Sequence, residues 1–248
     1  MNQLRLTTLL SAALFAAQLS IAHAAPFKVY SPIVENGVSE IEYRGFRDYD
    51  HRDEVNRSQT HKLGVGHGFG SWWTEIYGEL EKEGGESLKL ESVEWENLFQ
   101  LAPQGKYWAD FGVLVEYERA AHGGDPDKLV LAPLIEKELA PRLIATVNLR
   151  FVRELGGNSA NGTGIEYAAR LKYNHHPHLE PAIEFYGDPG RINHFLPHEE
   201  QSHWIGPALY GKAKLDHGHA LVYSMALLFG TTREASDRRG VVRLEYEF

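Results

Sequence analysis

Hydrophobic and polar residues alternate along most of this chain, which is the pattern of β-strands whose two faces meet different surroundings. The stretch 220–231 shows it clearly, because Leu221, Tyr223 and Met225 occupy every second position. Turn residues separate the alternating stretches, and none has the periodicity of an amphipathic helix. We expect twelve strands, at 38–49, 60–70, 72–81, 87–101, 107–119, 129–139, 143–154, 165–173, 179–187, 204–215, 220–231 and 240–248.

Several strands carry local irregularities. The apolar phase slips between Leu90 and Val93, which predicts a bulge in the fourth strand. Pro133 interrupts the alternation of the sixth strand. Gly64, Gly66 and neighbouring glycines alternate on the polar face of the second strand and predict close packing or sharp curvature there. A phosphate-binding loop is excluded at these glycines, because no Lys-Ser/Thr pair and no helix follow.

The faces opposite the apolar stripes are charged, and the connections between strands alternate in length. Long connections at 50–59, 120–128, 155–164 and 187–202 alternate with shorter ones at 71, 102–106, 140–142, 174–178 and 216–219. Short turns on one side and long loops on the other are typical of transmembrane barrels. The sequence therefore predicts an all-β fold, a single closed antiparallel up-and-down transmembrane β-barrel of about 12 strands over residues 38–248.

The N-terminus resembles a secretory signal peptide. Arg5 precedes an apolar run over 9–21, and Ala22-His23-Ala24 forms an A-x-A cleavage site. We expect a signal peptide over 1–24, cleaved after Ala24, and an extended periplasmic segment over 25–37. The apolar run is too short to span a bilayer comfortably, which argues against a membrane anchor.

Composition excludes several function classes. The chain of 248 residues carries 34 Asp+Glu against 25 Lys+Arg, a net charge of -9, and an acidic chain binds nucleic acid poorly. It has no cysteine, so disulfides, thiolate metal sites and cysteine nucleophiles are excluded. Its five tryptophans and twelve tyrosines predict aromatic girdles at the membrane interfaces.

The C-terminal stretch carries a resemblance to a known class. Val242, Leu244, Tyr246 and Phe248 place an apolar residue at every second position and end the chain on an aromatic. This strand resembles the last strand of Gram-negative outer-membrane β-barrel proteins, and the stretches 29–35 and 94–97 are similar to segments of uncharacterised, transporter-like barrels. The resemblance implies an outer-membrane location, contact with its lipid, and recognition by the barrel-assembly machinery through these four residues.

Histidines are the main candidates for metal chemistry. His194, His198, Glu199, Glu200 and His203 lie in or beside the longest loop. Imidazoles with carboxylates bind zinc, copper or nickel, so a divalent transition metal is the one cofactor that we consider. The spacing matches no established site, and solvated loop histidines explain the residues equally simply.

Enzymatic chemistry has little support. Ser202 and His203 are adjacent, and adjacent strand residues point to opposite faces, so the histidine cannot activate that serine. Ser224 lacks the context of a nucleophile elbow, which leaves an outer-membrane lipase as an unsupported alternative. Paired carboxylates such as Glu116 and Glu118 are better explained by ladders facing basic residues of neighbouring strands. We therefore expect no enzyme.

Three hypotheses for function remain. The first is a narrow channel or transporter for small solutes, in which the acidic balance favours cations. The second is a metal-binding outer-membrane protein that uses the loop cluster. The third is a structural or adhesive barrel whose lumen is closed by its own salt bridges. A lumen of about twelve strands lies between a filled barrel and an open pore, so the strand count does not decide among them.

Overall fold

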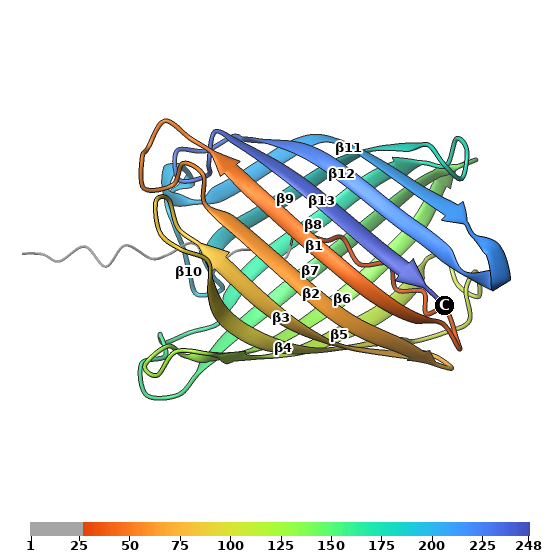
Figure 1. Ribbon diagram of the computed structural model, residues 1–248, viewed down its shortest axis with the longest axis horizontal. Coiled ribbons are helices and arrows are strands. Elements are labelled where there is room, and N and C mark those ends of the chain that lie inside the picture. The colour runs from red at the N-terminus through yellow and green to blue at the C-terminus, as the bar shows by residue number, and fades with distance from the viewer. Residues whose placement is uncertain (1–26) are drawn as a thin grey trace, which may run out of the picture.

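The computed structural model describes residues 27–248, which form a closed antiparallel β-barrel of twelve strands (Figure 1). Each strand pairs with the next, β9 pairs with β8 and β11, and β13 pairs with β1 to close the barrel. The two-residue β10 (His194–Phe195) pairs only with β9. The barrel strands are β1 (Ser39–Tyr49), β2 (Gln59–Phe69), β3 (Trp72–Lys82), β4 (Lys89–Gln100), β5 (Asp110–Ala120), β6 (Asp127–Ala140), β7 (Leu143–Leu155), β8 (Gly164–Tyr173), β9 (Glu180–Arg191), β11 (Ser202–Lys214), β12 (Ala220–Gly230) and β13 (Arg238–Glu247).

Both predicted irregularities have a physical explanation in the strand register. Glu79 pairs with Ser92 and Leu80 with Leu90, so Glu91 is the extra residue of a bulge, as predicted. Pro133 lies inside β6 and pairs with Val113 of β5. The pairing with β7 is interrupted around Pro133, because proline has no N–H to donate to that neighbour.

The strands turn their apolar faces outward and their charged faces into the lumen. Val65 is 59% exposed and Trp95 is 50% exposed, whereas Glu116 is 2% and Arg170 is 9% exposed. A water-soluble protein has the opposite arrangement, with apolar side chains inside and charged side chains outside. Apolar side chains on the outside are expected where the barrel contacts lipid. The prediction that the apolar stripes face outward is confirmed.

The two ends of the barrel differ. Two-residue turns at 70–71 and 141–142 lie at the end where β1 begins and β13 ends, and the longer connections 50–58 and 192–201 lie at the opposite end. The connection 101–109 is the exception on the short-turn end. Phe69, Trp72 and Phe99 stack on one another outside the barrel near the short turns, as an aromatic girdle requires. None of the helical turns among residues 27–248 is long and apolar enough to cross a membrane.

The N-terminal segment, defined here as residues 27–38, lies inside the barrel (Figure 1). The sequence predicts a periplasmic segment over 25–37, but the described part of it runs through the lumen and reaches β1 at the short-turn end. Phe27 is fully buried and Tyr30 is 5% exposed. The alternation of apolar and polar residues identifies strands only. It therefore could not predict the position of the N-terminal segment, which is not a strand. The predicted signal peptide lies outside the described residues.

The glycines of β2 make room for aromatic side chains of β3 in the lumen. Gly64 lies directly opposite Tyr77, and Gly66 and Gly68 lie under the indole of Trp73. A Cβ atom at Gly64 would lie 2.4 Å from the Tyr77 ring. These glycines therefore permit close packing, one of the two explanations that the sequence left open.

We expect Gly64→Ala to destabilise the barrel by about 1–3 kcal/mol, because the new methyl group must displace a buried ring in a packed interior. The matched control is Gly78→Ala on β3, where an added Cβ meets no atom within 4 Å. The measurement is the free energy of unfolding in urea, followed by tryptophan fluorescence of protein folded into lipid vesicles. Equal stability of the two variants would contradict this account of β2.

Candidate functional site

An apolar pocket in the lumen holds the first described residue of the N-terminal segment. The ring of Phe27 lies 5.1 Å from that of Phe46, 4.9 Å from that of Tyr186 and 5.3 Å from that of Trp204, measured between centroids. The guanidinium of Arg239 lies 4.0 Å from the centroid of Phe27, a cation–π contact. The pocket fixes one end of the segment in the half of the barrel that carries the long loops.

Side chains of the wall satisfy the backbone of the N-terminal segment. Asn148 accepts from the Tyr30 N–H at 2.7 Å and donates to the Tyr30 carbonyl at 2.9 Å. Gln100 accepts from the Val34 N–H at 3.0 Å, and Arg243 Nε donates to the Phe27 carbonyl at 2.7 Å. These buried backbone groups thus have partners without joining a β-ladder. The segment fills the lumen as a separate element.

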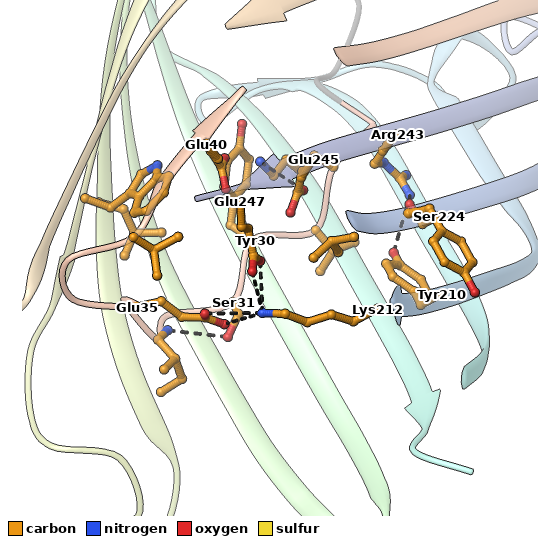
Figure 2. A pocket seen from close by; sticks show the side chains of 18 of the residues that line it. Tyr30, Ser31, Glu35, Glu40, Tyr210, Lys212, Ser224, Arg243, Glu245 and Glu247 are labelled. Atoms are coloured by element: carbon orange, nitrogen blue, oxygen red, sulfur yellow. Dashed lines mark hydrogen bonds and ion pairs between the residues drawn. The ribbon is translucent and has the colours of Figure 1, made fainter. Parts of the chain in front are cut away.

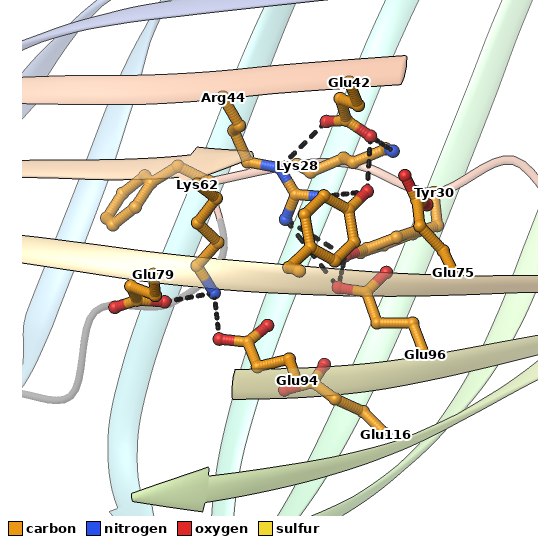
Figure 3. Close-up of polar contacts among 12 residues, drawn as sticks. Lys28, Tyr30, Glu42, Arg44, Lys62, Glu75, Glu79, Glu94, Glu96 and Glu116 are labelled. Carbon is orange, nitrogen blue, oxygen red and sulfur yellow. Dashed lines mark hydrogen bonds and ion pairs between the residues drawn. The ribbon is translucent and has the colours of Figure 1, made fainter. Parts of the chain in front are cut away.

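Charged side chains of the segment and wall form a buried network (Figure 3). Lys28 pairs with Glu42, which also accepts from Arg44 at 3.0 Å. Lys62 bridges two carboxylates at 2.5 Å each. These carboxylates belong to Glu79 and Glu94. Pairing and hydrogen bonding lower the cost of keeping such charges in a closed interior.

A second network surrounds Arg243, which is 3% exposed on β13. It pairs with Glu184 at 3.0 Å and donates to Tyr186 at 2.8 Å and to Ser224 at 2.9 Å. The same guanidinium holds the Phe27 carbonyl, so it joins the wall to the N-terminal segment. It is the most highly connected cation described in the lumen.

A cavity of about 510 Å³ lies beside the N-terminal segment, in the half of the barrel that carries the short turns (Figure 2). Basic groups on β8, β11 and β13 face it, and so do carboxylates on β1, β3, β4, β9 and β13. The charged side chains of the wall are Glu40, Glu75, Glu96, Arg170, Lys172, Glu180, Lys212, Arg243, Glu245 and Glu247. Such a space admits a small polar molecule or several waters.

Four of the buried charged side chains among residues 27–248 keep a polar atom without a hydrogen-bond partner. These atoms are Oε1 of Glu75, Oε2 of Glu94, Nε of Arg170 and Nη1 of Arg239. Buried polar atoms in native proteins are almost always paired with protein, water or an ion. Glu75 and Arg170 both line the cavity, so these atoms mark places where the protein can take an additional partner.

A smaller charged cluster ties two long loops together at the other end of the barrel. Burial raises the pKa of Asp50, but hydrogen bonds from the Arg52 side chain and from backbone N–H groups of Arg52 and Asp237 outweigh it and lower the pKa to about 2. Asp50 therefore stays ionised at any ordinary pH. The Asp237 carboxylate accepts from the His51 backbone N–H at 3.1 Å and from the His51 ring Nδ1 at 3.0 Å, which fixes the 50–58 loop against the 231–237 loop.

The histidines predicted as a metal site lie around the β9–β11 connection. His198 and His203 stack with ring centroids 5.8 Å apart, and His203 bonds Tyr167 through Nδ1 and Gln201 through Nε2. His194, Glu199 and Glu200 are exposed. The described groups that bring three ligand atoms within 4.8 Å of one another do not include these five residues, and metal binding there stays a prediction.

The serine–histidine alternative is not supported by the geometry. Ser202 is 4% exposed and lies on the same face of β11 as Trp204, while the neighbouring His203 bonds Tyr167 and Gln201. Ser224 accepts from Arg243 at 2.9 Å and serves the ion-pair network. The carboxylates proposed as ladder partners do meet basic residues, as Glu116 meets Arg150 at 3.1 Å. In the described structure, neither of these serines is hydrogen-bonded to a histidine.

No protein-family model matches the chain, and no curated protein matches it. Among solved structures, the NanC porin has a TM-score of 0.56 and 10% sequence identity over 84% of this chain and 98% of that chain. The outer membrane channel DcaP of Acinetobacter baumannii and Pseudomonas aeruginosa OprD each have a TM-score of 0.35 and 10% identity. They cover 86% and 89% of this chain and 96% and 98% of their own chains. The likeness to the NanC porin shows that this chain has the fold of an outer-membrane β-barrel.

Proposed function

We propose that this chain is an outer-membrane channel for small polar solutes that is closed at rest by its own N-terminal segment. Its fold is similar to that of a porin, and its exterior is apolar where lipid would lie. Its interior is charged and holds a cavity of about 510 Å³, which limits the solute to a small molecule. Export and an outer-membrane location are part of this proposal.

The observation that carries the proposal is the way in which the N-terminal segment occupies the lumen. The Tyr30 and Val34 backbones bond to side chains of the wall, so the segment can leave without the loss of a strand. Only Gly37 and Val38, next to β1, form backbone bonds with Gly68. A segment fixed at one end and held by side chains elsewhere is suited to opening and closing a pathway.

An engineered disulfide that holds the N-terminal segment against the barrel wall tests the proposal. The chain has no cysteine, so Pro32→Cys and Gly112→Cys would supply its only two thiols. A Cβ built at Gly112 lies 2.9 Å from the Pro32 Cβ, within a small shift of the spacing of about 3.5–4.5 Å in disulfides. We expect brief openings in planar bilayers from the reduced protein, none after oxidation, and their return on reduction.

The single variant Gly112→Cys is the control, because it cannot form the intramolecular bond. Openings that persist unchanged in the oxidised double variant would contradict movement of the N-terminal segment. The alternative is a structural or adhesive barrel whose lumen is closed by its own salt bridges. One observation favours it, the extensive pairing of lumen charges around Arg44 and Arg243. A barrel that conducts in no state would support that alternative.

A further inference from the structure

The strand register places carboxylates opposite carboxylates in the lumen. Glu42 of β1 lies opposite Glu245 of β13, and Glu40 lies opposite Glu247. On the other side of β2, Glu75 of β3 lies opposite Glu96 of β4. Like charges that face one another across strands are destabilising, and burial makes their repulsion stronger. This wall therefore needs positive charge from another source.

Glycine brings two of these carboxylates together. Gly66 of β2 pairs with Glu40 on one side and with Glu75 on the other, so β2 itself places no side chain between them, and the indole of Trp73 covers the glycine. Oxygens of Glu40, Glu42 and Glu75 all lie within 4.8 Å of one another. Each of the three residues is less than 9% exposed, and Oε1 of Glu75 has no hydrogen-bond partner. The cluster thus combines close carboxylates with a buried oxygen that is free to bind.

The local charge is not balanced by the protein. Four carboxylates meet here, those of Glu40, Glu42, Glu75 and Glu245. The basic groups beside them are Lys28, which pairs with Glu42 and lies 3.8 Å from Glu245, and Arg44, which pairs with Glu42 at 3.0 Å. With all of these groups ionised, the four carboxylates and two basic groups carry two negative charges in excess, and Glu96, which lies 3.9 Å from Arg44, adds a third. A divalent cation would offset two of these charges.

We propose that Glu40, Glu42 and Glu75 form a binding site for a divalent cation, with Ca²⁺ the best match. Two oxygens that bind the same Ca²⁺ at about 2.4 Å lie at most about 4.8 Å apart, and the three carboxylates meet this limit. Oxygen ligands without nitrogen or sulfur select hard cations. Glu40 and Glu75 line the cavity, which gives the ion a route of entry. Figure 2 labels Glu40 in this wall.

The indole of Trp73 offers a local reporter for this site. Trp73 Nε1 donates to Glu75 Oε2 at 3.2 Å, so the ring lies beside the proposed ligands. We would use full-length protein folded in detergent micelles, freed of metal by a chelator, and titrate it with Tb³⁺ while exciting tryptophan. We expect saturable Tb³⁺ emission that Ca²⁺ displaces. Glu75→Gln and Glu40→Gln should each weaken binding by about tenfold or more.

Two controls separate this site from others. Asp237→Asn alters the described loop cluster of Asp50, His51 and Asp237, and should leave the emission unchanged. Trp73→Phe should remove the emission but retain Ca²⁺ binding in calorimetry. Altered migration after boiling shows that each variant has folded. The proposal is overturned if Ca²⁺ does not compete for the emitting Tb³⁺, or if folded Glu40→Gln and Glu75→Gln both bind like the parent protein.

Discussion

Deleting residues 27–35 is expected to convert the barrel into a persistently open pore. These residues fill the lumen from the aromatic pocket of Phe27 to the ion pair of Glu35 with Lys212. A barrel of twelve strands lies between those that side chains fill and those that leave an aqueous channel, so removal of the segment leaves a narrow water-filled pathway. The deletion keeps residues 1–26, and with them the predicted signal peptide and cleavage site.

The open pore is expected to select cations, because the deletion also removes Lys28, the partner of Glu42. Planar-bilayer recordings in a salt gradient measure both the conductance and the reversal potential. Lys28→Met is the matched control: it removes the same charge but keeps the N-terminal segment in place, so conductance should stay at the level of the parent protein. A folded deletion variant with parental conductance would contradict the proposed role of the segment.

Replacing Arg243 with methionine is expected to destabilise the barrel by about 3–5 kcal/mol, because it leaves a buried carboxylate without its cation. Glu184, fully buried, would keep only the hydroxyls of Tyr186 and Tyr210 as partners. The Phe27 carbonyl would also lose its donor. The free energy of unfolding in urea, measured in lipid vesicles, reports the loss.

The double variant Arg243→Met with Glu184→Gln should recover part of that stability, since the second change removes the uncompensated charge. Lys212→Met is the matched control, because the Lys212 side chain is 36% exposed and an ion pair at such a position is worth about 1 kcal/mol or less. A loss at Arg243 no larger than that at Lys212 would show that the buried network adds little to stability.

The sequence predicted the barrel because alternation is a local property. Strand number, the outward stripes and the bulge at Glu91 all depend on residues near one another in the chain. The position of the N-terminal segment depends instead on partners such as Asn148 for Tyr30, 118 residues apart. No local pattern reports such a contact.

The candidate sites likewise depend on contacts between residues that are far apart in the chain. Glu40 and Glu75 lie close together because the residue between them in the sheet is Gly66, which has no side chain. A prediction of this contact needs the register of three strands. The predicted metal site of the loop histidines stays a prediction, since neighbours in sequence need not converge in space. His203 bonds Tyr167 of β8, whereas His194 lies exposed on β10. Spacing alone could not distinguish these two outcomes.

The bond between Arg243 and the Phe27 carbonyl has a consequence for the order of assembly. It joins residues 216 positions apart, and Arg243 belongs to β13, the last of the described strands in chain order. Contacts of such long sequence separation form late, after the intervening chain is organised. The Phe27 carbonyl therefore gains this donor only once β13 is in place in the barrel.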